Sequence, residues 1–181
     1  MSQKTVFVIG AGASKEVDLP IGSELKGKIK DLLKNPAAGD GAILKVFERI
    51  YDGTQKSSLL TASEQISRAM PQAISIDNFI DARSDNKAIV LCGKIAIVRA
   101  ILQAEEKSKL SGEKINFQSI EDTWFTKFFR LLFENCRPES LEERIKSIVL
   151  IVFNYDRCIE HFFIMHCKII MTSIPSKQFH Y

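Results

Sequence analysis

The chain contains two short runs of apolar residues that predict buried β-strands. Thr5–Ile9 (TVFVI) and Ser147–Phe153 (SIVLIVF) are rich in β-branched residues and show no alternation of apolar and polar positions. That pattern is typical of strands covered on both faces. The first run ends at Gly10-Ala11-Gly12, and the second is followed by Asn154-Tyr155-Asp156. Each predicted strand therefore leads into a glycine-rich or polar turn.

The residues between these runs have the spacing of helices. Apolar positions recur every three or four residues between Pro20 and Asn35 and again over Ala42–Tyr51. Further helices are predicted over Ile76–Ala82, Asn86–Lys109, Ser119–Cys136 and Arg157–His166. The expected capping boxes at helix starts are Thr61 with Glu64, Ser119 with Asp122, and Ser140 with Glu143. The aromatic residues of 119–136, Trp124 among them, are predicted to be core rather than a ligand cage.

Two strands separated by a long, mostly helical stretch predict an α/β fold. We expect a parallel Rossmann-like sheet with a large helical insertion at about 40–145. One domain is expected over residues 1–173, followed by a tail at 174–181. In parallel sheets, ligands bind beyond the carboxyl ends of the strands, which is where both turns would lie.

Composition and charge narrow the function classes. The 181 residues carry 25 Lys and Arg against 22 Asp and Glu, a net charge of +3. This charge is too small to favour nucleic acid as the main partner. The longest apolar stretch, Ala88–Leu102, is interrupted by charges and is too short to cross a bilayer, which argues against a membrane. Because no secretory signal opens the chain, a cytoplasmic location is expected.

Metal binding has little support in the sequence. The four cysteines form no CxxC pair, so neither a disulfide framework nor a zinc knot is indicated. His161 and His166 are expected on one helix, five positions apart, where they share no face well suited to a metal. No metal cofactor is therefore expected.

The glycine turn is the first candidate for chemistry. Gly10-Ala11-Gly12-Ala13-Ser14 follows a strand, so its backbone can admit a pyrophosphate while Ser14 donates a hydrogen bond. Lys15 stands where the GxGxxG dinucleotide fingerprint requires a third glycine, and no Walker motif is present. A simple reductase and a P-loop ATPase are therefore disfavoured. The alternative is a turn that only connects strand to helix.

The second candidate follows the second strand. Asn154 and Asp156 are two residues apart, so both side chains can point into one pocket. An amide can orient a ribose hydroxyl or a water molecule, and a carboxylate can stabilise a developing positive charge. The structural alternative is equally weighted: Asp156 caps the following helix, and Asn154 satisfies a turn.

Taken together, the two segments resemble the sirtuin-like family. VFVIGAGASKEVDLPIGSEL resembles the family's first motif, a GAGxS turn followed by a [GD]-[LI]-P loop that ends here at Pro20. FNYDRCIEHFF is similar to its second motif, in the NYD form typical of bacterial NAD-hydrolysing antiphage-defence proteins. Ser75–Phe79 resembles a segment often found between the two.

The resemblance implies a role for each matching residue. Gly10, Ala11, Gly12 and Ser14 would bind the phosphate and ribose of NAD, with the loop at Pro20 also lining the cofactor site. Asn154 would position the nicotinamide ribose or the attacking water, and Asp156 would lie near the nicotinamide. The implied reaction is cleavage of the N-glycosidic bond through an oxocarbenium-like state.

The sequence also departs from the family pattern. The family's third motif, His-Gly, has no counterpart, because the three histidines are followed by Phe162, Cys167 and Tyr181. We expect the chain to be the N-terminal, truncated part of a sirtuin-like domain that is an NAD glycohydrolase when intact. The alternative is a catalytically inactive module that senses NAD or ADP-ribose or contacts other proteins. The expected partners are NAD or a related dinucleotide, together with a homo-oligomer or a larger defence complex.

Overall fold

The computed structural model describes residues 4–37, 41–50, 53–112 and 115–172. It divides the chain into two compact units. The strand unit comprises Met1–Leu19 and Glu105–Tyr181, and the helical unit comprises Pro20–Ala104. The helical unit thus begins earlier and ends earlier than the predicted insertion at about 40–145. The predicted tail at 174–181 lies outside the described residues.

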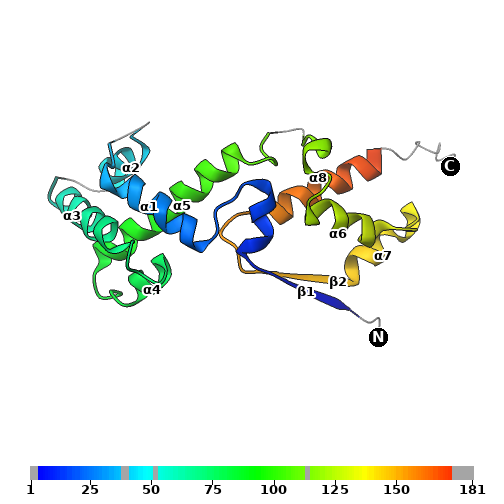
Figure 1. The fold of residues 1–181 in the computed structure, drawn as a ribbon, viewed down its shortest axis with the longest axis horizontal. Coiled ribbons are helices and arrows are strands. Elements are labelled where there is room, and N and C mark those ends of the chain that lie inside the picture. Colours follow the sequence, from blue (N-terminus) through cyan, green and yellow to red (C-terminus); the bar gives the residue numbers. More distant parts are fainter. Residues whose placement is uncertain (1–3, 38–40, 51–52, 113–114, 173–181) are drawn as a thin grey trace. The chain divides into compact units, whose positions relative to one another are not determined.

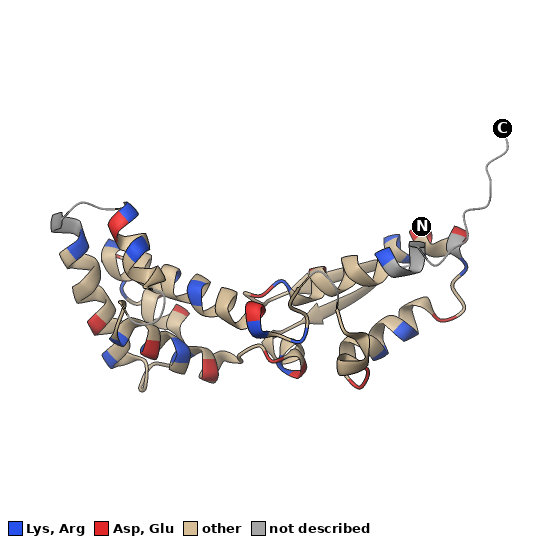
Figure 2. Cartoon of the chain, turned by 90° about the horizontal axis from the view of Figure 1, so that it is seen from above, with Lys and Arg blue, Asp and Glu red and all other residues tan. Residues whose placement is uncertain are grey.

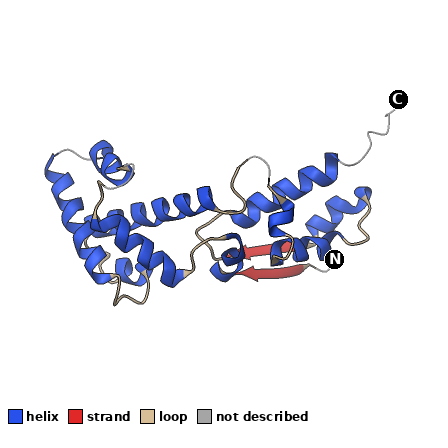
Figure 3. Cartoon of the chain, turned by 45° about the horizontal axis from the view of Figure 1, so that its top comes forward, coloured by secondary structure: helices blue, strands red, loops and turns tan. Residues whose placement is uncertain are grey.

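The strand unit combines a small sheet with helices (Figure 1). Along the chain its elements are β1 (Thr5–Ile9), η1 (Ala11–Val17), η2 (Phe117–Ile120), α6 (Trp124–Phe133), η3 (Pro138–Ser140), α7 (Leu141–Lys146), β2 (Ile148–Val152) and α8 (Cys158–Thr172). Figure 3 shows the two strands side by side. Both predicted strands and the helix after the second turn are confirmed, whereas α6 begins five residues after the predicted Ser119.

β1 and β2 are parallel. Their register runs from Thr5 opposite Ile148 to Ile9 opposite Val152. The pairing continues past the last strand residue, where the Phe153 N–H donates to the Ile9 carbonyl at 2.8 Å. The carboxyl ends of the two strands therefore meet at one edge, as the sequence predicted. The fold is mixed and mostly helical, with a two-stranded parallel sheet.

The prediction that both strands are covered on both faces is wrong. Val6 and Val8 of β1 are 52% and 67% exposed, and Ile151 of β2 is 43% exposed. The opposite face carries Phe7, whose ring meets that of Phe128 on α6 at 4.8 Å. An unbroken apolar run does not say how many faces are covered, because that depends on which helices pack against the sheet.

Aromatic residues of α6 and α8 form the core of the strand unit. Phe125 and Phe129 of α6 and Phe162 of α8 are fully buried. The rings of Phe129 and Phe162 lie 4.9 Å apart in an edge-to-face arrangement. The prediction that this aromatic segment is mainly core is confirmed for these residues.

The helical unit is built from α1 (Gly22–Lys34), α2 (Ala42–Ile50), α3 (Gly53–Ala69), α4 (Ile76–Asp81) and most of α5 (Lys87–Lys107). Its core gathers apolar residues from all five helices, including Leu33, Phe47, Ile66, Ile76 and Ala96, each at most 2% exposed. The predicted helices correspond to α1, α2, α4 and α5, whereas α3 begins eight residues before the helix start predicted at Thr61. Acidic and basic side chains are interspersed along the helices of each unit (Figure 2).

The predicted capping boxes do not form. Thr61 lies inside α3 and donates to the Ser57 carbonyl, and Ser119 lies inside η2. Ser140 precedes α7 but makes no side-chain capping bond. Ser75 does cap a helix: it accepts from the Asn78 N–H at 3.0 Å at the start of α4. A hydroxyl three residues before an acid also occurs inside helices, so the pattern alone does not locate a start.

Candidate functional site

A short 3₁₀ helix follows β1, and two glycines at its start, Gly10 and Gly12, are exposed. Gly10 is extended, with φ −109° and ψ 173°, and Gly12 is within η1. Neither has a positive φ, and a Cβ atom at either would meet no other atom within 4 Å. The backbone conformation at these two positions therefore does not require glycine. The absence of their side chains instead leaves free space over the backbone.

The segment after β2 lies beside this turn. Asn154 is half-buried, and Asp156 is buried with 7% of its surface exposed. Because both strands end at the same edge, Asn154 contacts Ser14, although the two residues are 140 positions apart in the sequence. We call Gly10, Ala11, Gly12, Ser14, Asn154 and Asp156 the strand-end site.

Three side chains of the strand-end site form a directed chain of hydrogen bonds. Asn154 Nδ2 donates to Ser14 Oγ at 3.0 Å, and Ser14 Oγ donates to Asp156 Oδ1 at 2.8 Å. Ser14 is 2% exposed, so the hydroxyl that joins the two bonds is shielded from water. Buried side-chain bonds of this kind hold each group in one orientation.

These two hydrogen bonds fix the orientation of the Asn154 amide. A hydroxyl has one proton, and that of Ser14 is donated to Asp156, so Ser14 can only accept from Asn154. The amide nitrogen must therefore face Ser14. Asn154 Oδ1 is buried and has no hydrogen-bond partner among the described residues. Such a group favours a ligand that donates a hydrogen bond to it.

Asp156 serves the following helix as well as the site. Its Oδ1 accepts from the N–H of Cys158, the first residue of α8, at 3.1 Å. Asp156 therefore both caps α8, one of the two roles that the sequence analysis weighed, and accepts a hydrogen bond from Ser14. Burial raises the pKa of the Cys158 thiol, and the neighbouring Asp156 carboxylate raises this pKa further. Cys158 is therefore held as a neutral thiol and is unsuited to act as a nucleophile.

A cavity of about 370 Å³ lies along the start of α8. It is lined by Glu105, Ser108, Arg157, Cys158 and His161, among others. The Glu105 carboxylate accepts from the Arg157 N–H at 2.8 Å, which ties the end of α5 to the turn after β2.

The structure thus brings together most of the residues that the sequence selected. The glycine turn, Ser14, Asn154 and Asp156 are in one place. Pro20 is buried and belongs to the helical unit. The sequence analysis missed two hydrogen bonds to this turn. The Trp124 backbone N–H donates to the Glu16 carboxylate, and the Trp124 indole N–H donates to the Ala13 carbonyl. No local signal could have found them, because aromatic spacing on a helix indicates burial only.

His161 and His166 both lie on α8, as predicted. Burial lowers the pKa of His166, whose ring stacks against Phe133 and Phe162. Within the described part of the chain, no group of three or more His, Cys, Asp or Glu residues is arranged to hold a metal ion.

Comparison of the chain with family models, with curated proteins and with solved structures found no match. In the described parts of the chain, no helix combines the length and apolar character needed to span a membrane.

Proposed function

We propose that the strand-end site binds NAD or a related dinucleotide, and that NAD bound there is cleaved to nicotinamide and ADP-ribose. The sirtuin-like motifs of the sequence suggest this ligand. The observation that carries the proposal is the buried, unpartnered Asn154 Oδ1 held beside a glycine turn with free space over its backbone.

The residues of the site suit the parts of such a ligand. The exposed backbone at Gly10 and Gly12 allows a pyrophosphate to approach closely. Asn154 Oδ1 requires a donor, which a ribose hydroxyl or an attacking water supplies. The Asp156 carboxylate provides negative charge where the cleaved sugar becomes positive.

The proposed reaction is a hydrolysis. The bond between the nicotinamide nitrogen and the ribose C1′ breaks, and its electron pair leaves with nicotinamide. The oxygen of water bonds to C1′, and one proton of that water is released. The products are nicotinamide and ADP-ribose. In this reaction Asn154 and Asp156 position the groups and stabilise charge.

Calorimetry with NAD and a chromatographic assay of nicotinamide release test the proposal. The wild-type chain is expected to bind NAD. Asn154→Ala is expected to weaken binding by roughly tenfold, because the hydrogen bond that Asn154 Oδ1 would accept from the ligand is lost. Asn116→Ala is the matched control, since Asn116 only caps η2 through the Gln118 N–H. Absence of NAD binding and of nicotinamide release by the wild type would refute the proposal.

A second candidate is a module that binds NAD or ADP-ribose without cleaving it. The observation in its favour is that no histidine of the sequence is followed by glycine. A positioned acid or base contributes about 10²- to 10⁴-fold to a rate. Binding by calorimetry without nicotinamide release would favour this candidate, whereas release that is lost in Asn154→Ala would exclude it. The proposed biological setting of either candidate is bacterial antiphage defence.

A further inference from the structure

Trp124 is hydrogen-bonded twice to the turn that follows β1. Its indole Nε1–H donates to the Ala13 carbonyl at 2.5 Å, and its backbone N–H donates to Glu16 Oε2 at 2.6 Å. Ala13 lies between the exposed Gly12 and the buried Ser14. The indole bond therefore fixes the backbone at Ala13, between exposed Gly12 and the Ser14 hydroxyl that bonds to Asp156.

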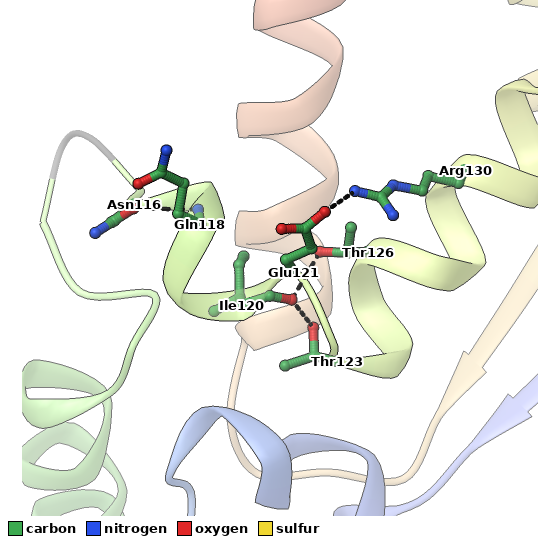
Figure 4. A network of polar contacts seen from close by, with 7 residues as sticks. All are labelled: Asn116, Gln118, Ile120, Glu121, Thr123, Thr126 and Arg130. Atoms are coloured by element: carbon green, nitrogen blue, oxygen red, sulfur yellow. Dashed lines mark hydrogen bonds and ion pairs between the residues drawn. The ribbon is translucent and has the colours of Figure 1, made fainter.

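The start of α6 is also held by contacts that do not involve the turn. Thr123 and Thr126 both donate to the Ile120 carbonyl, at 2.7 and 2.9 Å, and Glu121 pairs with Arg130 at 2.9 Å (Figure 4). The Thr123 hydroxyl is thus used elsewhere, and it does not cap α6. The Glu16 carboxylate, from the turn, accepts the first N–H of the helix instead.

Ring contacts restrict the Trp124 indole as well. Its ring lies 4.5 Å from that of Phe125 and 5.5 Å from that of Phe128. Phe128 in turn meets Phe7 of β1. The indole N–H is therefore presented to Ala13 from a packed position.

From these contacts we infer that Trp124, together with Glu16, is a positioning residue for the strand-end site. It holds the backbone from Gly12 to Ala13 in the shape that admits the dinucleotide. This inference rests on the proposed function for its ligand, but the positioning of the turn is measurable without any ligand.

The rest of the turn has its own anchors, so a variant at Trp124 keeps its fold. The Lys109 N–H donates to the Val17 carbonyl at 3.3 Å, and Lys109 Nζ donates to the Glu16 carbonyl at 3.0 Å. Val17 and Ser14 are buried. Loss of the indole N–H therefore removes one anchor from the first half of the turn and leaves the second half attached.

The first experiment uses Trp124→Phe, which keeps an aromatic ring and removes the N–H. The full chain is titrated with NAD and with ADP-ribose in a calorimeter. We expect affinity to fall by about three- to tenfold, the usual effect of losing one hydrogen bond, with an unchanged circular-dichroism spectrum. Trp124 is the single tryptophan of the sequence, so ADP-ribose is also expected to change the fluorescence of the wild-type chain.

Variants at Glu16 separate positioning from general stability. Glu16→Ala removes the acceptor for the Trp124 N–H and is expected to weaken binding, whereas Glu16→Gln keeps an oxygen there and is expected to restore it. Glu121→Ala is the control, because it breaks the pair with Arg130 near the same helix start, and among the described residues the side-chain bond of Glu121 is to Arg130 and not to the turn. Its affinity is expected to equal that of the wild type.

The outcomes distinguish this inference from the proposed function. If the wild type binds NAD or ADP-ribose and Trp124→Phe binds equally tightly, the inference is overturned and the proposed function stands. If the wild type binds neither, the proposed function fails. Amide hydrogen exchange then decides the inference, because faster exchange at residues 10–14 in Trp124→Phe supports positioning of the turn and unchanged exchange refutes it.

Discussion

Gly93 on α5 and Ile80 on α4 approach each other so closely that a side chain at position 93 would force Ile80 to move. A Cβ atom on Gly93 would lie 2.5 Å from Ile80 Cδ1 and 2.8 Å from Ile80 Cγ1. Gly93 is buried, and its neighbour Cys92 is fully buried. A glycine in the middle of a long helix is therefore favoured here by packing rather than by its backbone freedom.

Gly93→Ala is expected to destabilise the helical unit by about 1 kcal/mol. Overpacking costs roughly 1–3 kcal/mol, and the gain of about 1 kcal/mol from replacing glycine inside a helix offsets part of that cost. The measurement is urea unfolding followed by circular dichroism. Gly27→Ala on α1 is the matched control, because a Cβ there meets nothing within 4 Å and should stabilise the chain. Equal effects of the two substitutions would contradict the packing argument.

Ser14→Ala is expected to lower the free energy of unfolding of the strand unit by roughly 1–3 kcal/mol, because both of its hydrogen-bond partners lose their contact. Asn154→Ala should add little once Ser14 is gone, since contacting residues are coupled. Urea unfolding followed by Trp124 fluorescence reports this unit. Ser119→Ala is the control, because Ser119 is exposed and bonds only to the Asn116 carbonyl. Strict additivity of Ser14→Ala and Asn154→Ala would count against the hydrogen-bond chain.

Acid is expected to destabilise the strand unit through His166. Burial lowers the pKa of His166 in the fold, so the unfolded chain takes up the proton first. The free energy of unfolding should therefore fall as the pH drops below about 6.5, the ordinary value for histidine, and level off below the lowered pKa. His166→Phe, which replaces the imidazole by another aromatic ring in this cluster, should show a smaller fall. The same pH slope in both proteins would rule out this origin.

Thiol reagents are expected to distinguish the four cysteines. Burial raises the pKa of Cys92 to about 12 and also raises that of Cys167. Cys92 and Cys158 are buried, whereas Cys136 is partly exposed. At about pH 8, where thiolate controls the rate, iodoacetamide should label Cys136 first, as peptide mass spectrometry would show. Cys92 should react only in denaturant, and early labelling of Cys92 would disprove its burial.

Local patterns in the sequence predicted most elements of the fold, but not the start of α3 or the capping boxes. The β-branched run at Thr5–Ile9 and the helical spacing after Pro20 depend on neighbouring residues only, so they could be recognised without tertiary structure. The meeting of Ser14 with Asn154 also followed from sequence, because parallel strands place their carboxyl ends at one edge.

Other features depended on the tertiary structure. Three features depend on how the elements pack against one another: the exposure of Val8, the close approach of Gly93 to Ile80, and the bond from Trp124 to Ala13. Trp124 and Ala13 are 111 positions apart, and nothing in either neighbourhood specifies the other. The sequence by itself determined which segments become strands, helices and turns, because those choices are local. Only the folded chain decided which donor meets which acceptor, because hydrogen bonds require distances and directions that packing alone sets.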